Sequence, residues 1–363
     1  MSSVASYVPA LDGLRAVAVI AVMVYHSGLI LGGYLGVDVF FTLSGFLITR
    51  LLVEEYDARG TIGLRDFYYR RALRLLPALF TFLTVCTIVL LSTVPLPFWY
   101  VIWTYLAIVT FYVANWALIL GSPLGILGHT WSLAIEEQFY FIWPLTILFL
   151  LRSVRSRSNA MLLLLGAAGA SLSWRLYLTL GGETLDRVYW GTDTHADGLL
   201  IGAALAFVIG IKTFSGVALR YASVGAATVL IYLLTFAPLS PAFAYGVTSV
   251  IALVTAIVIL DATSTRSWMA ILLERRWMVW TGRISYGLYL WHFPVFFQLG
   301  VLRQGVGRDI SYERIALAWG VTFAAATASY LLIERPALAL KTRFAWQSEE
   351  AVMTSARHPG WHP

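Results

Sequence analysis

The sequence predicts an all-α fold, a polytopic membrane helix bundle of about ten transmembrane helices with one further re-entrant or interfacial segment. Of the 363 residues, 59% are hydrophobic and only 12% are charged, which is more apolar surface than a soluble chain of this length buries. The apolar residues form runs close to the ~20 residues that a helix needs to cross a bilayer. Strands would leave backbone groups unpaired in lipid, so the spans are expected to be helical.

Eleven apolar segments are candidate spans: 11–31, 34–54, 75–94, 97–119, 132–151, 159–179, 196–212, 218–236, 243–260, 284–302 and 313–334. Arginine-rich loops at 55–74, 152–158 and 261–283 and a basic tail predict the cytoplasmic side. Loops on one side are joined by an even number of crossings, so one candidate between 74 and 152 does not span. We expect 97–119 to be re-entrant or to lie flat. Ten crossings then place both termini in the cytoplasm.

The chain is expected to form one membrane-embedded domain over 1–340, followed by a polar, disordered cytoplasmic tail over 341–363, which has no apolar periodicity. The net charge of +6 is concentrated in loops. It therefore indicates orientation in a lipid bilayer and no nucleic-acid partner. The sequence does not encode an oligomeric state.

The first span carries an arginine and a histidine, Arg15 and His26, eleven residues apart. At 100° per residue they share one helical face and lie roughly 16 Å apart along the axis, with Arg15 nearer the cytoplasm. Ionisable residues inside an apolar span are costly, so the pair indicates a functional site. The alternative is that Arg15 reaches the headgroups and His26 lies at the far interface.

The next two spans carry an aspartate, a serine–glycine pair and two arginines. Asp38 either orients a partner on the first helix or lies in water at the interface. Ser44 and Gly45 favour close helix packing over a nucleophilic role. Arg71 and Arg74 are three apart and share a helical face, which suits phosphate groups. The alternative is a positive-inside anchor against lipid headgroups.

The segment HTWSLAIEEQFYFIWP is polar where a spanning helix begins. In a helix, His129 and Glu136 share a face with Ser132 between them. Glu136 and Glu137 point about 100° apart, so one is expected to bind the acceptor or support structure, and the other to meet water or an arginine. Acidic pairs entering a membrane helix are expensive, which favours function.

The segment YWGTDTHADG places Asp193 and Asp197 four residues apart, on one face if it is helical, with His195 pointing elsewhere. Ligands two apart on one helix do not converge on a metal, so no metal site is predicted. A sugar-binding or capping role on the outer side is expected instead.

Two further polar features lie in the last spans. His292, within SYGLYLWHFPV, is either a satisfied core histidine or a site residue. Glu334 and Arg335 are expected to form an interfacial clasp on the cytoplasmic side.

Together these segments resemble acyltransferase family 3, whose members are integral membrane O-acyltransferases. The pieces that carry the resemblance run in order from residue 7 to 336: LDGLRA followed by arginine, ten residues and histidine, then GVDVFFTLSGFLI, FYYRRALRLLP, HTWSLAIEEQFYFIWP, GTDTHADGLLIGAAL, SYGLYLWHFPV and IERP. The resemblance implies transfer of an acyl group, usually acetyl from acetyl-CoA, to a hydroxyl of a glycan, glycolipid or secondary metabolite. It also implies a multi-pass protein of the bacterial cytoplasmic membrane, similar to the stand-alone members without an extracytoplasmic esterase-like domain.

The family's arginine–histidine motif carries over to Arg15 and His26, and its Arg-x-x-Arg motif to Arg71 and Arg74. We expect acyl-CoA, as donor co-substrate and not a permanently bound cofactor, to place its phosphates near the last two and its thioester arm near Arg15. His26 is then the general base, since a neutral imidazole suits this role near pH 7. Supporting catalytic roles are expected for Arg15, Glu136 and Asp38, and substrate-binding roles for His129, Glu137, Asp193, Asp197 and His292.

Three alternatives stay open at this stage. The acyl group passes first to the enzyme, on His26 or on a serine such as Ser132. The chain is a glycolipid or polysaccharide transporter or flippase without acyl-transfer chemistry. The chain is a non-catalytic scaffold in an envelope assembly, which would tolerate replacement of His26.

Overall fold

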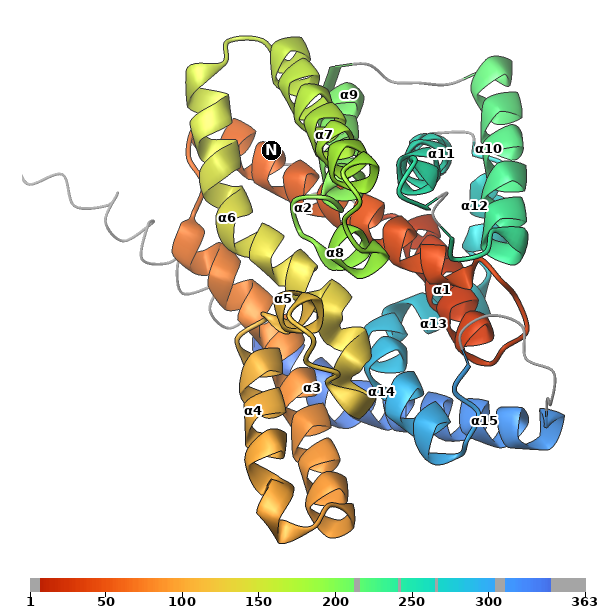
Figure 1. Ribbon diagram of the computed structural model, residues 1–363. Coiled ribbons are helices and arrows are strands. Elements are labelled where there is room, and N and C mark those ends of the chain that lie inside the picture. The colour runs from red at the N-terminus through yellow and green to blue at the C-terminus, as the bar shows by residue number, and fades with distance from the viewer. Residues whose placement is uncertain (1–6, 212–215, 241–242, 265–266, 304–310, 341–363) are drawn as a thin grey trace, which may run out of the picture.

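A computed structural model of the chain describes residues 7–211, 216–240, 243–264, 267–303 and 311–340 (Figure 1). This described part of the chain is 82% helical and contains no strand, as the sequence predicts. The expected tail over 341–363 lies outside the described residues.

The helices have the following bounds: α1 Pro9–His26, α2 Gly36–Arg59, α3 Leu64–Thr93, α4 Trp99–Thr110, α5 Ala114–Ile119, α6 Trp131–Ser153, α7 Arg157–Leu180, α8 Leu185–Trp190, α9 Asp197–Ile211, α10 Val217–Phe236, α11 Val247–Ala262, α12 Met269–Leu273, α13 Arg276–Arg283, α14 Ser285–Gln298 and α15 Tyr312–Ser329. Short 3₁₀ turns precede α2, α4 and α6, at η1 Gly33–Leu35, η2 Leu96–Phe98 and η3 Gly125–Thr130. A π turn, η5 Tyr330–Glu334, follows α15.

The protein is a multi-pass membrane protein. Within the described residues, seven helical segments are long and apolar enough to cross a bilayer: Pro9–His26, Gly33–Arg59, Leu64–Thr93, Gly125–Ser153, Arg157–Leu180, Val217–Phe236 and Tyr312–Leu340. Three shorter apolar helices cover Leu96–Thr110, Asp197–Ile209 and Val247–Ala262. The number of ten crossings, and the side on which the termini lie, stay predictions.

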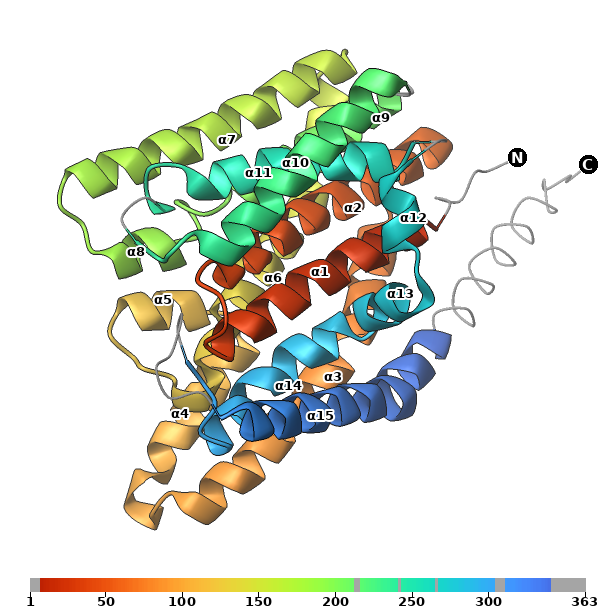
Figure 2. The same cartoon turned by 90° about the vertical axis from the view of Figure 1, so that its right-hand side faces the viewer.

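Helices α1 and α2 lie at the centre of the bundle (Figure 2). On one side, α9 packs on α2 and is covered by α7 and α11, while α10 packs on α11. On the other side, α13 and α14 pack on α1, and α15 packs on α14. Helices α3 and α4 form a hairpin that extends beyond the rest of the bundle (Figure 1).

Glycines let the central helices touch backbone to backbone. A Cβ atom at Gly45 of α2 would lie 1.9 Å from the carbonyl oxygen of Leu199 in α9, and one at Gly202 of α9 would lie 2.0 Å from that of Thr42. Such close approach between small residues is a common basis of helix association in membranes. The packing role expected for Gly45 is therefore confirmed.

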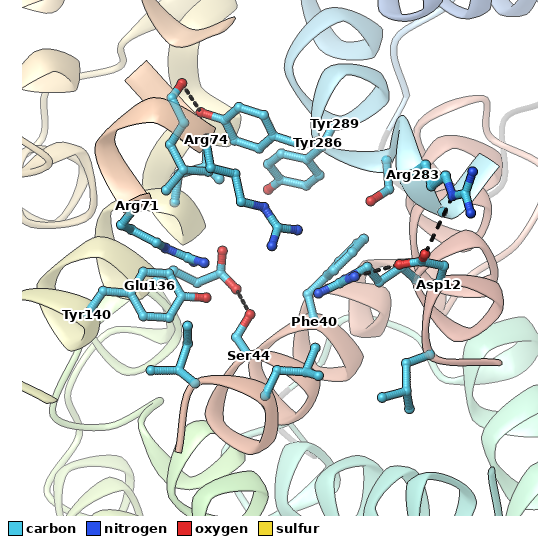
Figure 3. A pocket seen from close by; sticks show the side chains of 18 of the residues that line it. Asp12, Phe40, Ser44, Arg71, Arg74, Glu136, Tyr140, Arg283, Tyr286 and Tyr289 are labelled. Atoms are coloured by element: carbon cyan, nitrogen blue, oxygen red, sulfur yellow. Dashed lines mark hydrogen bonds and ion pairs between the residues drawn. The ribbon is translucent and has the colours of Figure 1, made fainter. Parts of the chain in front are cut away.

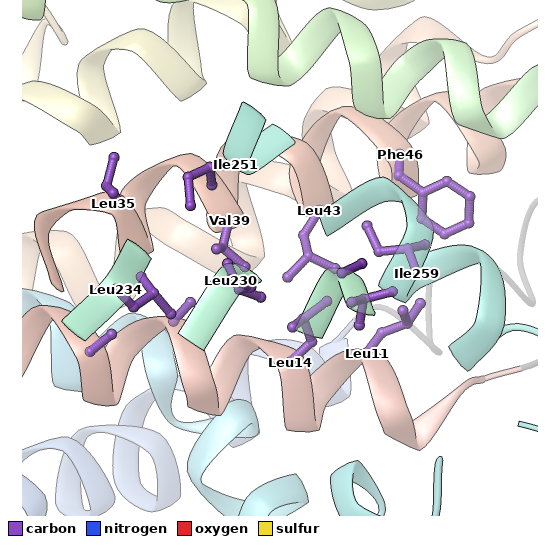
Figure 4. Packing of buried hydrophobic residues seen from close by; sticks show 14 of the residues in the cluster. Leu11, Leu14, Leu35, Val39, Leu43, Phe46, Leu230, Leu234, Ile251 and Ile259 are labelled. Carbon is purple, nitrogen blue, oxygen red and sulfur yellow. The ribbon is translucent and has the colours of Figure 1, made fainter. Parts of the chain in front are cut away.

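One face of α1 and α2 is buried in a hydrophobic cluster with α10 and α11 (Figure 4). Labelled members of this cluster are Leu11, Leu14, Leu35, Val39, Leu43, Phe46, Leu230, Leu234, Ile251 and Ile259. Ser44, which follows the cluster member Leu43, points away from this cluster and donates a hydrogen bond to Glu136 of α6.

Two local predictions are corrected by the structure, one in the loop before α3 and one before α9. The second half of the predicted loop 55–74 is helical, because α3 begins at Leu64 and carries its arginines on its first turns. The segment 97–119, which we expect not to span, is broken between α4 and α5, where Tyr112 has a positive φ of 54°. It contains no helix of spanning length, and its re-entrant or flat placement stays a prediction. Residues 191–196 are not helical, and α9 begins only at Asp197.

Candidate active site

A pocket of about 560 Å³ lies between α1, α2, α3, α6 and the α13–α15 side of the bundle (Figure 3). Its volume falls within the ~300–1,000 Å³ typical of small-molecule sites. Aliphatic and aromatic side chains form most of its wall. Its charged lining comprises five arginines and three carboxylates: Arg15, Arg50, Arg71, Arg74, Arg283, Asp12, Glu136 and Glu334. The pocket is thus positively charged and suited to an anionic ligand with an apolar part.

Three of these arginines are the ones that the motifs predicted. Arg71 and Arg74 point from α3 into the pocket (Figure 3), and the Arg71 guanidinium lies 3.5 Å from the centre of the Tyr140 ring. Arg15 of α1 donates a 2.7 Å hydrogen bond to Asp12 one turn earlier. The first span and the Arg-x-x-Arg segment therefore meet at one cavity, as expected.

The two glutamates of α6 diverge as the helical geometry predicted. Glu136 lines the pocket and accepts a 2.6 Å hydrogen bond from the Ser44 hydroxyl of α2. Glu137 lies outside the lining, 4.0 Å from Arg71. Ser44 was expected only to permit close packing, but it also holds the carboxylate of Glu136 in place.

A group of three histidines lies outside the pocket lining, next to the pocket residue Tyr289. His26, at the end of α1, has Nδ1 3.1 Å from Nε2 of His292 in α14. The His129 ring, in η3, lies 5.6 Å from the His292 ring and is stacked on Phe293 at 4.8 Å. Arg15 and His26 thus share a helix but face different surroundings, and neither touches the other.

Tyr289 connects the pocket to this group of histidines. It lines the pocket, and its ring lies 5.5 Å from that of His292. Its hydroxyl donates to the backbone oxygen of His129 at 2.9 Å and lies 2.6 Å from the Ser132 hydroxyl. Since a carbonyl only accepts, the tyrosine proton goes to His129 and Ser132 donates to Tyr289.

The remaining predicted site residues lie in ion pairs around the start of α9. Asp38 accepts from His195 at 2.8 Å, so its partner is not on the first helix as expected. Asp197 accepts from Arg175 with both carboxylate oxygens, at 3.1 Å each, in a fully buried pair. The pair that Asp193 forms with Arg187, at 2.6 Å, is partly exposed.

Asp193 and Asp197 do not share a helical face, because the chain turns between them. Burial would raise the pKa of Asp193, but hydrogen bonds from Arg187 and Trp174 lower it below its ordinary value. Neither aspartate lines the pocket. A substrate-binding role for either one stays a prediction.

Sequence reasoning missed the buried charge of Arg175 and the position of Glu334 in the pocket wall. Arg175 is fully buried in the last turns of α7, and an arginine inside an apolar span was a signal that could have identified it. Glu334 is buried, lines the pocket and accepts from Ser329 at 3.2 Å. The expected clasp with Arg335 is not formed, because Arg335 is exposed on another face.

An all-helical membrane bundle with an arginine-lined pocket defines a class of membrane proteins with a site suited to an anionic ligand. Comparison with known families identifies the chain more closely. Its residues 8–334 match the acyltransferase domain of the acyltransferase 3 family. The chain belongs to this family, as the sequence motifs indicated.

Curated relatives include O-acetyltransferases of bacterial cell walls. The peptidoglycan O-acetyltransferase OatA of Listeria monocytogenes is 35% identical, over 91% of this chain and 56% of that protein. YrhL of Bacillus subtilis, for which the same activity has been proposed, is 38% identical over 91% of this chain and 55% of its own. The chain therefore spans about half the length of the curated relatives that it matches. No solved structure matches it.

Proposed function

We propose that the chain is a membrane O-acyltransferase that moves an acetyl group from acetyl-CoA to a hydroxyl of a cell-envelope glycan. The observation that carries the proposal is that one helix, α1, supplies both Arg15 to the charged pocket and His26 to the group of three histidines. Peptidoglycan, named as the substrate of the Listeria relative, is the first acceptor to test. We place the chain in the bacterial cytoplasmic membrane with both termini inside.

The pocket supports acetyl-CoA as the donor. Its phosphates would bind Arg71 and Arg74, whose planar, permanently charged groups suit phosphate oxygens. The pantetheine arm would then run past Arg15 and the aromatic wall toward Tyr289. Arg15 and His26 are separated by roughly 16 Å along α1, so an extended donor is needed to bridge the two.

At the histidines, His26 would act as general base on the acceptor hydroxyl. Its neutral imidazole takes the hydroxyl proton as the oxygen attacks the thioester carbonyl. The new C–O bond forms, the C–S bond breaks, and CoA leaves as a thiolate that recovers the proton. Glu136, Asp38 and His292 are candidates to orient either His26 or the sugar, and of the three only His292 contacts His26.

An acyl-enzyme formed on Ser132 has less support. Its hydroxyl is hydrogen-bonded to Tyr289 and not to a histidine, so it lacks an adjacent general base that could activate it as a nucleophile. Labelled acetyl-CoA supplied without an acceptor would leave a trapped acetyl group on the protein if such an intermediate forms. Under direct transfer, the protein stays unlabelled.

The testing experiment measures acetyl transfer to peptidoglycan fragments by the purified full chain in nanodiscs. His26→Gln is expected to lower turnover about 10²–10⁴-fold, the usual contribution of a general base. Acetyl-CoA affinity, measured by calorimetry, should be unchanged. A His26→Gln protein that binds the donor and keeps full turnover would refute the assignment of His26.

The arginine assignment needs a matched control on the same helix. Arg71→Ala or Arg74→Ala should weaken acetyl-CoA binding about tenfold or more, since a hydrogen bond to a charged group contributes about 1.5–3 kcal/mol. Arg70→Ala removes the same charge from α3 outside the pocket, where Arg70 pairs with Glu55 at 3.5 Å. It should leave binding unchanged. If all three variants bind acetyl-CoA as tightly as wild type does, Arg71 and Arg74 are only topological anchors. If wild type itself binds no acetyl-CoA, a transporter is favoured.

A further inference from the structure

Two histidines from helices far apart in the sequence are joined by a direct hydrogen bond. Nε2 of His292 lies 3.1 Å from Nδ1 of His26. The His292 ring is fully buried. The end of α1 is held in place by the backbone N–H of Arg303, which donates to the His26 carbonyl at 2.8 Å. The two rings are therefore held by their helices in a fixed relation.

The hydrogen-bond partners of His292 decide which of its nitrogens carries the proton. Nδ1 lies 2.7 Å and 3.1 Å from the carbonyl oxygens of Tyr289 and Leu288 in its own helix. Carbonyl oxygens only accept, so Nδ1 must bear the hydrogen. A neutral imidazole has one N–H, so Nε2 of His292 is an acceptor.

The protonation state of His292 determines which nitrogen of His26 carries the proton. Because Nε2 of His292 accepts, Nδ1 of His26 must donate, and Nε2 of His26 keeps its lone pair. A cationic His292 would reverse the direction. However, no carboxylate in the described part of the chain is hydrogen-bonded to either ring, and an unpaired cation is costly among the aromatic rings of Phe293 and Phe296.

We propose that His292 is a positioning residue that holds His26 in the tautomer whose Nε2 takes the proton of the acceptor hydroxyl. The inference rests on the proposed role of His26 as general base. A free imidazole exchanges between two tautomers, and the partner of one nitrogen determines the state of the other. Without His292, His26 would spend part of its time with Nε2 protonated and unable to act as a base.

The first test is spectroscopic and needs no turnover. The ¹⁵N shifts of the full chain, labelled at histidine and held in nanodiscs, distinguish protonated from unprotonated ring nitrogens. The His26 and His292 signals are assigned from His26→Gln and His292→Gln. The expected result is protonated Nδ1 and unprotonated Nε2 in both rings. A His26 ring with Nε2 protonated would overturn the inference.

The second test compares two replacements of His292. His292→Met removes the acceptor at similar volume and should lower kcat roughly tenfold or more, with KM for acetyl-CoA unchanged. His292→Gln supplies an amide oxygen that can accept from His26 and should recover a large part of kcat. Phe296→Leu disturbs packing on the same ring without removing the hydrogen bond, so it should lower thermal stability and leave kcat near wild type.

The outcomes separate this inference from the proposed function. Equal kcat in the His292→Met and His292→Gln proteins would make His292 a packing residue only, even where turnover still depends on His26. Turnover that is independent of His26 would refute the proposed function, whatever tautomer the ¹⁵N shifts report.

Discussion

Two arginine–aspartate pairs hold the chain around the start of α9, and they allow a direct test of what burial does to an ion pair. Arg175, fully buried, donates to both oxygens of Asp197, to Ser249 at 3.0 Å and to the Thr194 carbonyl at 2.8 Å. Arg175→Met keeps most of the side-chain volume but leaves the Asp197 carboxylate buried without its cation. Breaking a buried pair by removing one partner costs about 3–5 kcal/mol.

The control is the other pair. Arg187 and Asp193 form a comparably short contact, but the Asp193 side chain is 38% exposed. Exposed pairs contribute about 0–1 kcal/mol, so Arg187→Met should change the free energy of unfolding little. Adding Asp197→Leu to Arg175→Met should recover part of the loss, because no unpaired charge is then buried.

The assay is unfolding of the purified chain by SDS titration in mixed micelles, followed by tryptophan fluorescence, with circular dichroism confirming that each variant is helical at the start. We expect the free energy of unfolding to fall strongly in Arg175→Met, to fall little in Arg187→Met and to recover in part in the double variant. Equal losses for the two arginines would show that burial does not determine the contribution of these pairs.

Two further predictions concern packing and pH. Gly45→Ala should strongly destabilise the bundle, because the new Cβ would lie 1.9 Å from the Leu199 carbonyl oxygen. Gly166→Ala is the control: no atom lies within 4 Å of its Cβ, so the change should be neutral or stabilising by up to about 1 kcal/mol. The melting temperatures of the two variants in detergent test this difference. Because the folded-state pKa of Asp193 is lowered, its pair with Arg187 stabilises the chain above the unfolded pKa of about 3.9 and loses this contribution as pH falls through the lower folded value. The small melting-temperature advantage of wild type over Asp193→Asn should therefore be present at pH 7 and shrink toward pH 3, and an advantage independent of pH would contradict this account.

Residues that share one helix were predicted well, because helical periodicity determines their relative directions. Arg71 and Arg74 share the pocket, and Glu136 and Glu137 diverge, as the spacing required. The all-helical class followed from composition, and the family from the order of its motifs. Arg15 attracted attention because a charge within an apolar span is expensive.

Contacts between helices could not be predicted in this way. Periodicity shows which way a side chain points, but not which helix it meets. His26 and His292 are 266 positions apart, and Asp38 and His195 are 157 apart. The direction of the Asp193 side chain could not be predicted either, because it depends on a non-helical turn that ends just before α9.

The π turn after α15 has a consequence for the shape of the pocket. In a regular α-helix, side chains spaced four apart drift around the axis by about 40° at each step. The wider turn at 330–334 takes up this drift, so that Tyr330, Glu334 and Leu338 all face the same cavity. A regular α-helical turn in its place would leave the side chains of Tyr330 and Glu334 about 40° apart around the axis. The backbone geometry of this short stretch therefore determines which side chains of the last helix reach the pocket.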